Sequence, residues 1–459
     1  MKIASRRGVQ AALRLMALIT FGALAMPLAA APDQPAAAGR LQDAAIRYQF
    51  AIYYPDAPAK PPIDALRARL SRMTAPPKLV ARISIPPKRA MIAATLNLKA
   101  QQEYAPPRPS QVHYFGRGLT TAQAEGLQRA RQALILDFGH PAKASMSAYR
   151  ASLVIAEQVA RDTGGLLWDE ETREIFTVDE WHKRRLESWQ GDLPDVSQQT
   201  IIHAYQGDGQ LVRSISLGMG KFGLPDVVIA RFPWSSTDRM GWLLNAFLQG
   251  LVEGAPSGAQ GRFELDFRAI RHDRLRQRLL EQASPKGSGK AALLVVTTPM
   301  EQGDPQNRLL ALRFDRAAGK DEGSRQDSLL AGLFGSTEGK VAWIRDGDAT
   351  LAAASKAAKA KLPALREAFN RGLRPGEYIL VKAPFRLANG GTEWMWVEVS
   401  AWSGDVITGL LKNEPANIPS LHAGQQVTVS QRELFDYSRH FPDGRIEGNE
   451  TSKIIERLR

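Results

Sequence analysis

The chain has 459 residues, of which 60 are lysine or arginine and 47 are aspartate or glutamate, giving a formal net charge of +13 at pH 7. It contains no cysteine, which excludes disulfide bonds, thiolate metal sites and a lipid-modified cysteine. The length is enough for two or three domains with hydrophobic cores of their own.

The first 31 residues are typical of a secretory signal peptide. Their basic residues are Lys2, Arg6, Arg7 and Arg14. An apolar run over 15–28 and small residues at 29–31 follow. The alternative is an uncleaved membrane anchor, but the run is short of the about 20 residues that a span needs. We therefore expect a periplasmic or secreted protein, cleaved after residue 31 or nearer Ala38, with no transmembrane span in the mature chain.

A first α+β unit is predicted over 45–190, after a spacer at 32–44 that is rich in proline and alanine. Apolar alternation predicts strands over 47–54, 79–85, 91–98 and 133–138, and a hairpin over 166–176. Helical spacing predicts helices over 63–73, 121–131, 145–163 and 178–189. Gly164 and Gly165 are typical of the left-handed end of a helix.

A second α+β unit is predicted over 198–345. Its strands are expected over 200–205, 211–217, 227–230, 262–267, 291–297 and 309–314, and the segment 340–344 ends it. A helix is expected over 239–252, and the polar stretch 316–327 is predicted to be a mobile loop. The order of strands and helices in both units favours sandwich-like layers with helices on one side of a sheet.

The last part of the chain is predicted to be rich in β-strands. A helical connector over 349–372, kinked or split at Pro363, leads into a domain over 373–459. Strands are expected over 378–383, 394–399, 406–411 and 426–429, which suits a small barrel or roll. The fold class is therefore α+β: two sandwich-like units followed by a β-rich barrel or roll.

Two glycine-rich segments partly match the motifs of phosphate-binding loops. The segment 218–223 reads G-x-G-x-x-G, but Leu224, Pro225 and Asp226 lead into another strand instead of the helix that a dinucleotide site needs. We predict a tight loop between strands, with Lys221 available as a surface anion contact. The segment 284–290 ends in Gly-Ser-Gly-Lys but lacks the first glycine of a phosphate loop. Because the histidines are scattered as well, we expect no cofactor and no metal.

Four arginines, Arg268, Arg271, Arg274 and Arg278, recur at spacings of three and four. This spacing predicts that they share one face of a helix, where they would bind an anionic polymer. The alternative is a solvated helix face without a ligand.

Carboxylates and tryptophans lie close together in the sequence of the C-terminal domain. The acids are Glu393, Glu398, Glu414 and Asp436, and the aromatic residues are Trp394 and Trp396. Aromatic platforms beside paired carboxylates bind and cleave glycans. The alternative is structural: a half-exposed strand at 394–399 with one core face, and a turn at 413–415 whose side chains bond backbone amides.

The C-terminal motifs resemble a known family. They are Val381-Lys382-x-Pro384-Phe385, Met395-Trp396-Val397, Gly409-Leu410-x-x-Asn413-Glu414-Pro415 and Gly444-Arg445-Ile446-Glu447-Gly448. Over about Leu373 to Ile455 the chain is similar to the YegJ-like bacterial family, domain of unknown function 2314. Trp394 stands where the family often has histidine. The segments 165–176 and 218–226 also resemble sequences found beside such domains, and the resemblance implies no activity.

Two functions follow as hypotheses. The first is a non-enzymatic interaction or binding protein of the bacterial envelope. Its partner would be an envelope protein, an anionic polymer or a lipid headgroup surface, because the leader argues against nucleic acid. The second is a glycan-directed envelope hydrolase that uses carboxylates of the C-terminal domain.

Overall fold

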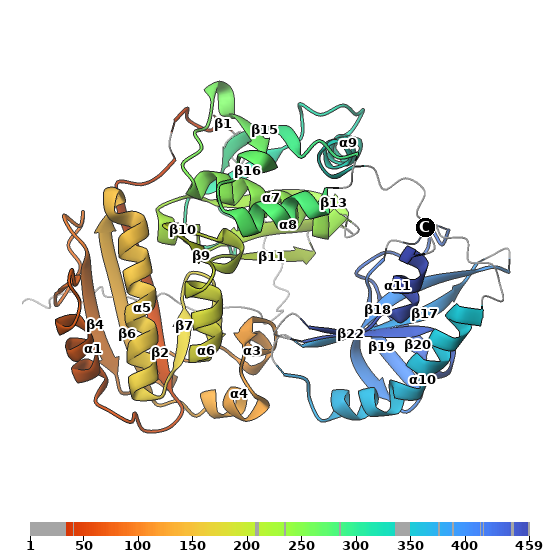
Figure 1. The fold of residues 1–459 in the computed structure, drawn as a ribbon, viewed down its shortest axis with the longest axis horizontal. Coiled ribbons are helices and arrows are strands. Elements are labelled where there is room, and N and C mark those ends of the chain that lie inside the picture. Colours follow the sequence, from red (N-terminus) through yellow and green to blue (C-terminus); the bar gives the residue numbers. More distant parts are fainter. Residues whose placement is uncertain are drawn as a thin grey trace, which may run out of the picture.

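The computed structural model describes residues 34–39, 41–206, 211–233, 236–283, 286–335, 349–374, 377–387, 390–413, 415, 417–441 and 445–457. The predicted leader, the segment 340–344 and Glu414 lie outside the described residues. The described part is a mixed α+β structure whose helices accompany three large sheets, shown in Figure 1.

The first sheet has the order β3-β4-β6-β2-β7-β8-β5. Its strands are β2 (Ala45–Tyr54), β3 (Lys78–Leu79), β4 (Met91–Asn97), β5 (Gly116–Arg117), β6 (Gln132–Pro141), β7 (Leu166–Asp169) and β8 (Glu174–Phe176). The predicted strand over 79–85 shrinks to β3, because the chain turns away and Ile83 packs on Met91 and Ala93.

Helices cover both faces of this sheet. Phe50 and Ile52 of β2 pack against α1 (Pro62–Ser71) and α5 (Ser145–Thr163). Ala51 and Tyr53 point the other way, because successive side chains alternate along a strand. They pack on the side of α2 (Ala100–Glu103), α3 (Pro109–Phe115) and α4 (Thr121–Leu127). The prediction of helices on one side is therefore wrong here, since β2 is apolar on both faces.

The second sheet has the order β1-β15-β16-β13-β12-β11, with β14 also paired to β15. Its strands are β1 (Gln34–Pro35), β11 (Ile201–Gln206), β12 (Leu211–Leu217), β13 (Asp226–Pro233), β14 (Arg262–Asp266), β15 (Lys290–Thr298) and β16 (Leu309–Arg313). One face packs on α7 (Thr237–Val252), α8 (Asp273–Gln282) and α9 (Glu322–Phe334). Part of the predicted spacer thus adds to this sheet as the edge strand β1.

Helix α9 occupies the second half of the mobile loop that was predicted over 316–327, whereas residues 316–321 have no regular structure. Asp321 accepts a hydrogen bond from the Ser324 amide at 2.8 Å, and the Ser324 hydroxyl bonds back to the Asp321 amide at 3.1 Å. This reciprocal cap satisfies the first turn. Leu330 and Leu333 then bury the last turns against the core, so the loop prediction is wrong from residue 322 onward.

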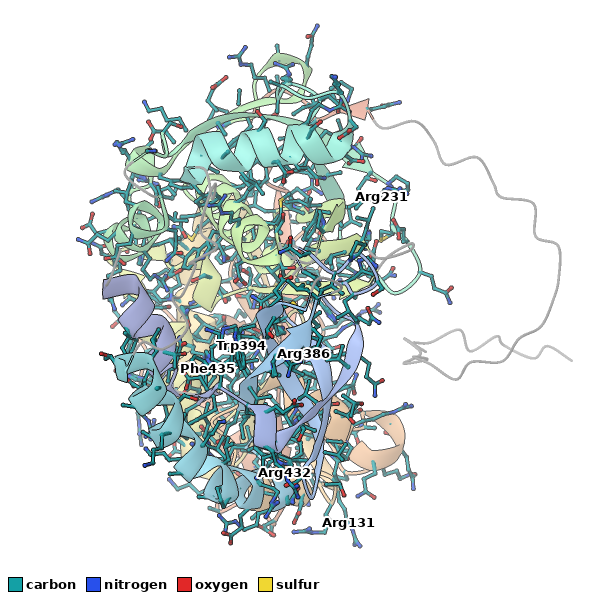
Figure 2. All side chains as sticks on the ribbon, turned by 90° about the vertical axis from the view of Figure 1, so that its right-hand side faces the viewer. Arg131, Arg231, Arg386, Trp394, Arg432 and Phe435 are labelled. Atoms are coloured by element: carbon teal, nitrogen blue, oxygen red, sulfur yellow. The ribbon has the colours of Figure 1, made fainter. Side chains whose placement is uncertain are left out.

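The third sheet has the order β20-β19-β18-β17-β21-β22. Its strands are β17 (Tyr378–Arg386), β18 (Thr392–Ser403), β19 (Val406–Leu411), β20 (Gln426–Ser430), β21 (Asp436–His440) and β22 (Ile446–Gly448). Leu362 and Leu365 of α10 (Ala349–Asn370) pack on one face, and the helix continues through Pro363. No closed barrel is found among the described residues, so the prediction of a barrel or roll is not confirmed. Figure 2 views this part of the molecule from the front.

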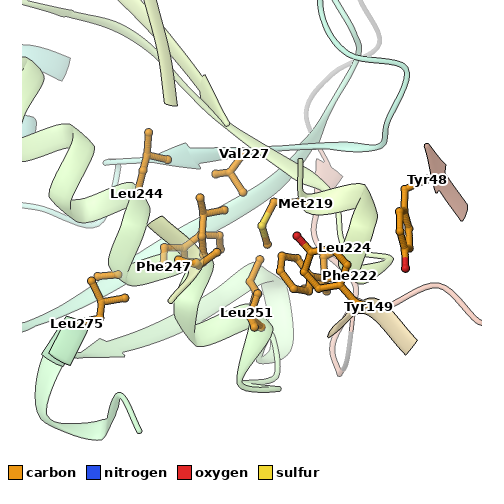
Figure 3. Close-up of a cluster of buried hydrophobic side chains, with 14 of the residues drawn as sticks. Tyr48, Tyr149, Met219, Phe222, Leu224, Val227, Leu244, Phe247, Leu251 and Leu275 are labelled. Carbon is orange, nitrogen blue, oxygen red and sulfur yellow. The ribbon is translucent and has the colours of Figure 1, made fainter. Parts of the chain in front are cut away.

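A continuous hydrophobic core joins the first two sheets, as Figure 3 shows. The 3₁₀ helix η4 (Met219–Phe222), between β12 and β13, brings Phe222 against α5. The rings of Phe222 and Tyr149 meet edge to face with centroids 5.0 Å apart. We call this region, where η4 meets α5 and the β7–β8 turn, the junction.

Among the described residues, no helix combines the length and the apolar character that crossing a membrane requires.

Candidate functional site

The predicted carboxylates of the C-terminal domain are engaged in local contacts. Glu398 pairs with the Lys412 ammonium at 3.0 Å. Asp436 is buried and accepts bonds from the amide and hydroxyl of Thr451, at 2.8 and 2.6 Å, where α11 (Glu450–Arg457) begins. Glu393 accepts the Asn417 amide at 3.1 Å. These contacts favour the structural alternative for the three acids.

The two predicted aromatic residues lie on the face of the third sheet that is turned away from α10. Trp394 is 38% exposed, and its ring packs on Phe435 with centroids 4.7 Å apart (Figure 2). Trp396 is half-buried, and its amide donates to the Asn413 side chain at 2.6 Å. The predicted turn at 413–415 therefore bonds a backbone amide, as expected.

The four arginines of the predicted row do not share a helix face, because α8 begins only at Asp273. Arg268 donates to the Ser288 carbonyl at 2.8 Å and Arg271 to the Glu253 carbonyl at 3.0 Å. From α8, Arg274 donates to the Glu187 carbonyl at 3.0 Å, and Arg278 donates to Asp195. The prediction of one helix face is wrong, and two of these side chains tie α8 to the segment 187–195.

The glycine-rich segment 218–223 is a tight loop between two strands, as predicted. Gly218 and Gly223 have φ values of 108° and 69°, which favour glycine. A Cβ added to Gly223 would lie 2.6 Å from the side chain of Ile46. The expectation of Lys221 as a surface anion contact is wrong, because its side chain has no exposed surface.

Lys221 is part of a buried ion cluster at the junction. Its ammonium lies 2.5 Å from Asp169 and donates to the Gln199 carbonyl at 2.7 Å. The guanidinium of Arg185, also buried, bonds Asp169 at 3.0 Å and Glu174 at 2.8 Å. Burial alone would raise the pKa of Glu174, but the positive charges of Arg185 and Arg117 lower it to about 2. Each buried charge therefore has an opposite charge within hydrogen-bond distance.

Two further carboxyl groups at the junction have pKa values that are raised toward neutral pH. Burial and the charge of Asp169 raise the pKa of Glu171 to about 7. Burial also raises the pKa of Asp226 to about 6, although Asn307 and Ser216 donate to its carboxylate at 2.8 Å. Perturbed pKa values of this kind occur both at functional sites and in structural ion clusters.

A pocket of about 160 Å³ opens beside the ion cluster, between the first and second sheets. Its lining consists of Arg117, Glu174, Arg184, Arg185, Ser197, Gln198, Thr200, Ile201, Ile202 and Asn245. In the part of the chain that the structure describes, the buried Nε of Arg185 has no acceptor. The Asn245 amide, on α7, has no hydrogen-bond partner among the residues described. We call this cavity the junction pocket.

A second depression, of about 250 Å³, lies between α7 and β14. Its acid Glu253 already accepts bonds from the amides of Arg271 and His272, at 2.7 and 3.0 Å. The described residues contain no group of three or more His, Asp or Glu that could hold a metal ion. The junction pocket is therefore the better candidate, because the described residues provide no acceptor for the Arg185 Nε or the Asn245 amide in its lining.

Comparison with known proteins identifies one part of the chain. Residues 348–457 match the family of uncharacterised proteins conserved in bacteria known as DUF2314. The match confirms the resemblance seen in the sequence, and it begins before α10, so it includes this helix and the whole third sheet. No curated protein and no solved structure matches the chain.

The DUF2314 module contains Trp394, Trp396 and the predicted carboxylates, whereas the junction pocket lies outside it. Sequence reasoning missed the pocket residues Arg117, Arg184 and Asn245, which are far apart in the chain. The available signal was indirect. The segments 165–176 and 218–226, which the sequence analysis compared with sequences found beside such domains, contribute Asp169, Glu174 and Lys221 to the ion cluster.

Proposed function

We propose that the protein is an exported, non-enzymatic binding protein of the bacterial envelope that holds an anionic group in the junction pocket. The leader-like first 31 residues support export. Acidic residues outnumber basic ones after Gly376, so the positive charge of the chain belongs to the part that contains the pocket. A basic body outside the cytosol meets anionic headgroups and wall polymers rather than nucleic acid.

The cationic lining of the junction pocket carries this proposal. Arg117 and Arg184 keep 15% and 27% of their side chains exposed, so a ligand reaches them, and Arg185 lies beneath. Arg117 also bonds Glu174 at 2.7 Å, which fixes its direction. Planar guanidinium groups match the oxygens of phosphate and carboxylate, and the Asn245 amide supplies a further donor.

The size of the pocket limits the ligand. A cavity of about 160 Å³ accepts one small oxyanion group and excludes a whole polymer. We therefore infer that the ligand is a phosphate or a carboxylate group, held alone or at the end of a larger envelope molecule. Binding of this kind weakens as salt screens the charges.

The test is calorimetric titration of the mature protein with inorganic phosphate. We expect binding that Asn245→Leu and Arg184→Gln each weaken by about tenfold, because each removes one hydrogen bond to a charged group. Arg131→Gln is the matched control, since Arg131 is exposed outside this lining. Equal affinities for all four proteins, or no binding at millimolar phosphate, would refute the proposal.

A second arm separates the sources of the phosphate. Vesicles that contain phosphatidylglycerol are compared with vesicles of phosphatidylcholine in a sedimentation assay. Retention on the anionic vesicles that free phosphate displaces supports a headgroup ligand. Phosphate binding without retention supports a free anion, and both results support an anion pocket.

A further inference from the structure

On one face of the third sheet, aromatic side chains surround a buried lysine. Residues 382 and 396 lie directly opposite each other on β17 and β18. Both point away from the core that Val381, Val397 and α10 build on the opposite face. We call the side turned away from α10 the outer face.

Lys382 is only 8% exposed, yet it has no carboxylate within ion-pair distance in the described part of the chain. Its ammonium lies 5.6 Å from the centroid of the Trp396 ring and 6.0 Å from that of Phe435. Asp436 is its neighbour on β21, but its carboxylate oxygens bond Thr451 and the Tyr437 amide. Ring faces offset only part of what it costs to desolvate an ammonium.

Burial lowers the pKa of Lys382, and the charge of Asp436 opposes this effect. An anion arriving from solvent would supply the missing acceptor and stabilise the charged form. The ammonium is therefore prepared for a negatively charged group that the described protein does not provide.

The indole N–H groups of the tryptophans beside Lys382 donate to no acceptor among the described residues. The indole N–H groups of Trp168, Trp181, Trp189 and Trp402 each donate to an acceptor. Within the described residues, those of Trp242, Trp394 and Trp396 have none. A buried indole normally finds a partner. Trp394 is 38% exposed and is held at an angle of 40° to Phe435, so part of its ring is open for stacking.

We propose that the outer face around Lys382 is a binding site for a ring compound that carries a carboxylate. The carboxylate lies at the Lys382 ammonium, and the ring lies on Trp394. A sugar acid and an aromatic acid share this chemistry. The site is separate from the junction pocket, so either proposal can fail alone.

The experiment titrates the full mature chain with four probes. Galacturonate and benzoate carry both a ring and a carboxylate, galactose carries only the ring, and acetate carries only the carboxylate. Incorporated 5-fluorotryptophan reports the contact by fluorine NMR, with the Trp394 signal assigned from Trp394→Phe. We expect this signal to shift with at least one ring acid, at an affinity about tenfold above those of galactose and acetate. If galacturonate alone shifts the signal, the ligand is a sugar acid, and if benzoate alone does, it is an aromatic acid.

Variants decide between binding at Lys382 and binding elsewhere. Lys382→Met keeps the apolar stem against Trp396 and removes the charge, and Trp394→Leu removes the platform. Each is expected to weaken binding of the ring acid, measured by calorimetric titration because Trp394→Leu lacks the fluorine reporter, by about tenfold. Lys356→Met, at an exposed position of α10, is the matched control and is expected to bind as the wild type. Acetate binding as tightly as the ring acids, unchanged affinity in both variants, or no shift with any probe would each overturn the proposal.

Discussion

Lys221 is a charged side chain without exposed surface, and the junction holds it beside Asp169 at 2.5 Å. Arg185 shares the same carboxylate and reaches Glu174 as well. Removing one partner from such a cluster leaves an uncompensated buried charge, which costs several kcal/mol. The charges at the junction therefore act as a unit that fixes the β7–β8 turn against η4.

Glu171 is one of the residues of this region that make stability depend on pH. Its pKa is raised to about 7 in the folded protein by burial and by Asp169, whereas it is ordinary in the unfolded chain. Its contribution to stability is therefore fully present below pH 4.5 and is lost as the pH rises through about 7.

We predict that Glu171→Gln raises the free energy of unfolding at pH 8 and leaves it nearly unchanged at pH 4.5, because glutamine resembles the protonated acid. The expected gain at pH 8 is about 1 to 2 kcal/mol, less than the full shift implies because the side chain is partly exposed. Urea unfolding at both pH values measures it. Glu125→Gln, at an exposed position, is the control, and an equal effect of both substitutions would contradict the assignment.

At the scale of elements, the sequence predicts strands well where apolar residues alternate or run together. Strand β2 and helix α5 form close to the predicted bounds because each carries a long, regular apolar pattern. Helix α9 was missed because its first turns are polar and its apolar residues gather at the end. Helix α11 was missed because it is short and polar, and its start is fixed by Asp436 from another element.

The cap of α9 provides a test at this scale. We predict that Asp321→Ala lowers the free energy of unfolding by about 1 kcal/mol, because the Ser324 amide loses its acceptor. Asp327→Ala, on an exposed position of the same helix, is the matched control. Thermal unfolding compares the two variants, and a loss as large in Asp327→Ala would show that the cap has no special role.

At the scale of the whole molecule, the candidate site depends on contacts that no local pattern contains. Arg117 comes from β5, and Arg184 follows α6 (Val178–Trp181). Asn245 lies on α7, which packs on the second sheet. Only the packing of the two sheets brings them together. The sequence predicted the basic character of this part of the chain, but it could not predict where its donors converge.

The prediction of export can be tested by determining the residue at which the mature chain begins. Gln34 and Pro35 pair with β15, and Ala36 is buried in the core. We therefore predict that processing removes the leader before Gln34, because cleavage nearer Ala38 would delete this edge strand. Mass spectrometry of the protein from a periplasmic fraction identifies its first residue. A mature chain that starts at or after Ala38, or an unprocessed chain in the cytosol, would contradict this prediction.

The proposal that the junction pocket binds an anion is tested most directly by the position of a bound oxyanion in a crystal of the mature protein. Crystals soaked in selenate, a phosphate-like anion with a strong anomalous signal, reveal that position without assumptions about the ligand. We predict an anomalous peak in the junction pocket, within hydrogen-bond distance of Arg117, Arg184 and Asn245. Peaks only at other surfaces, with the pocket empty at a saturating concentration, would contradict it.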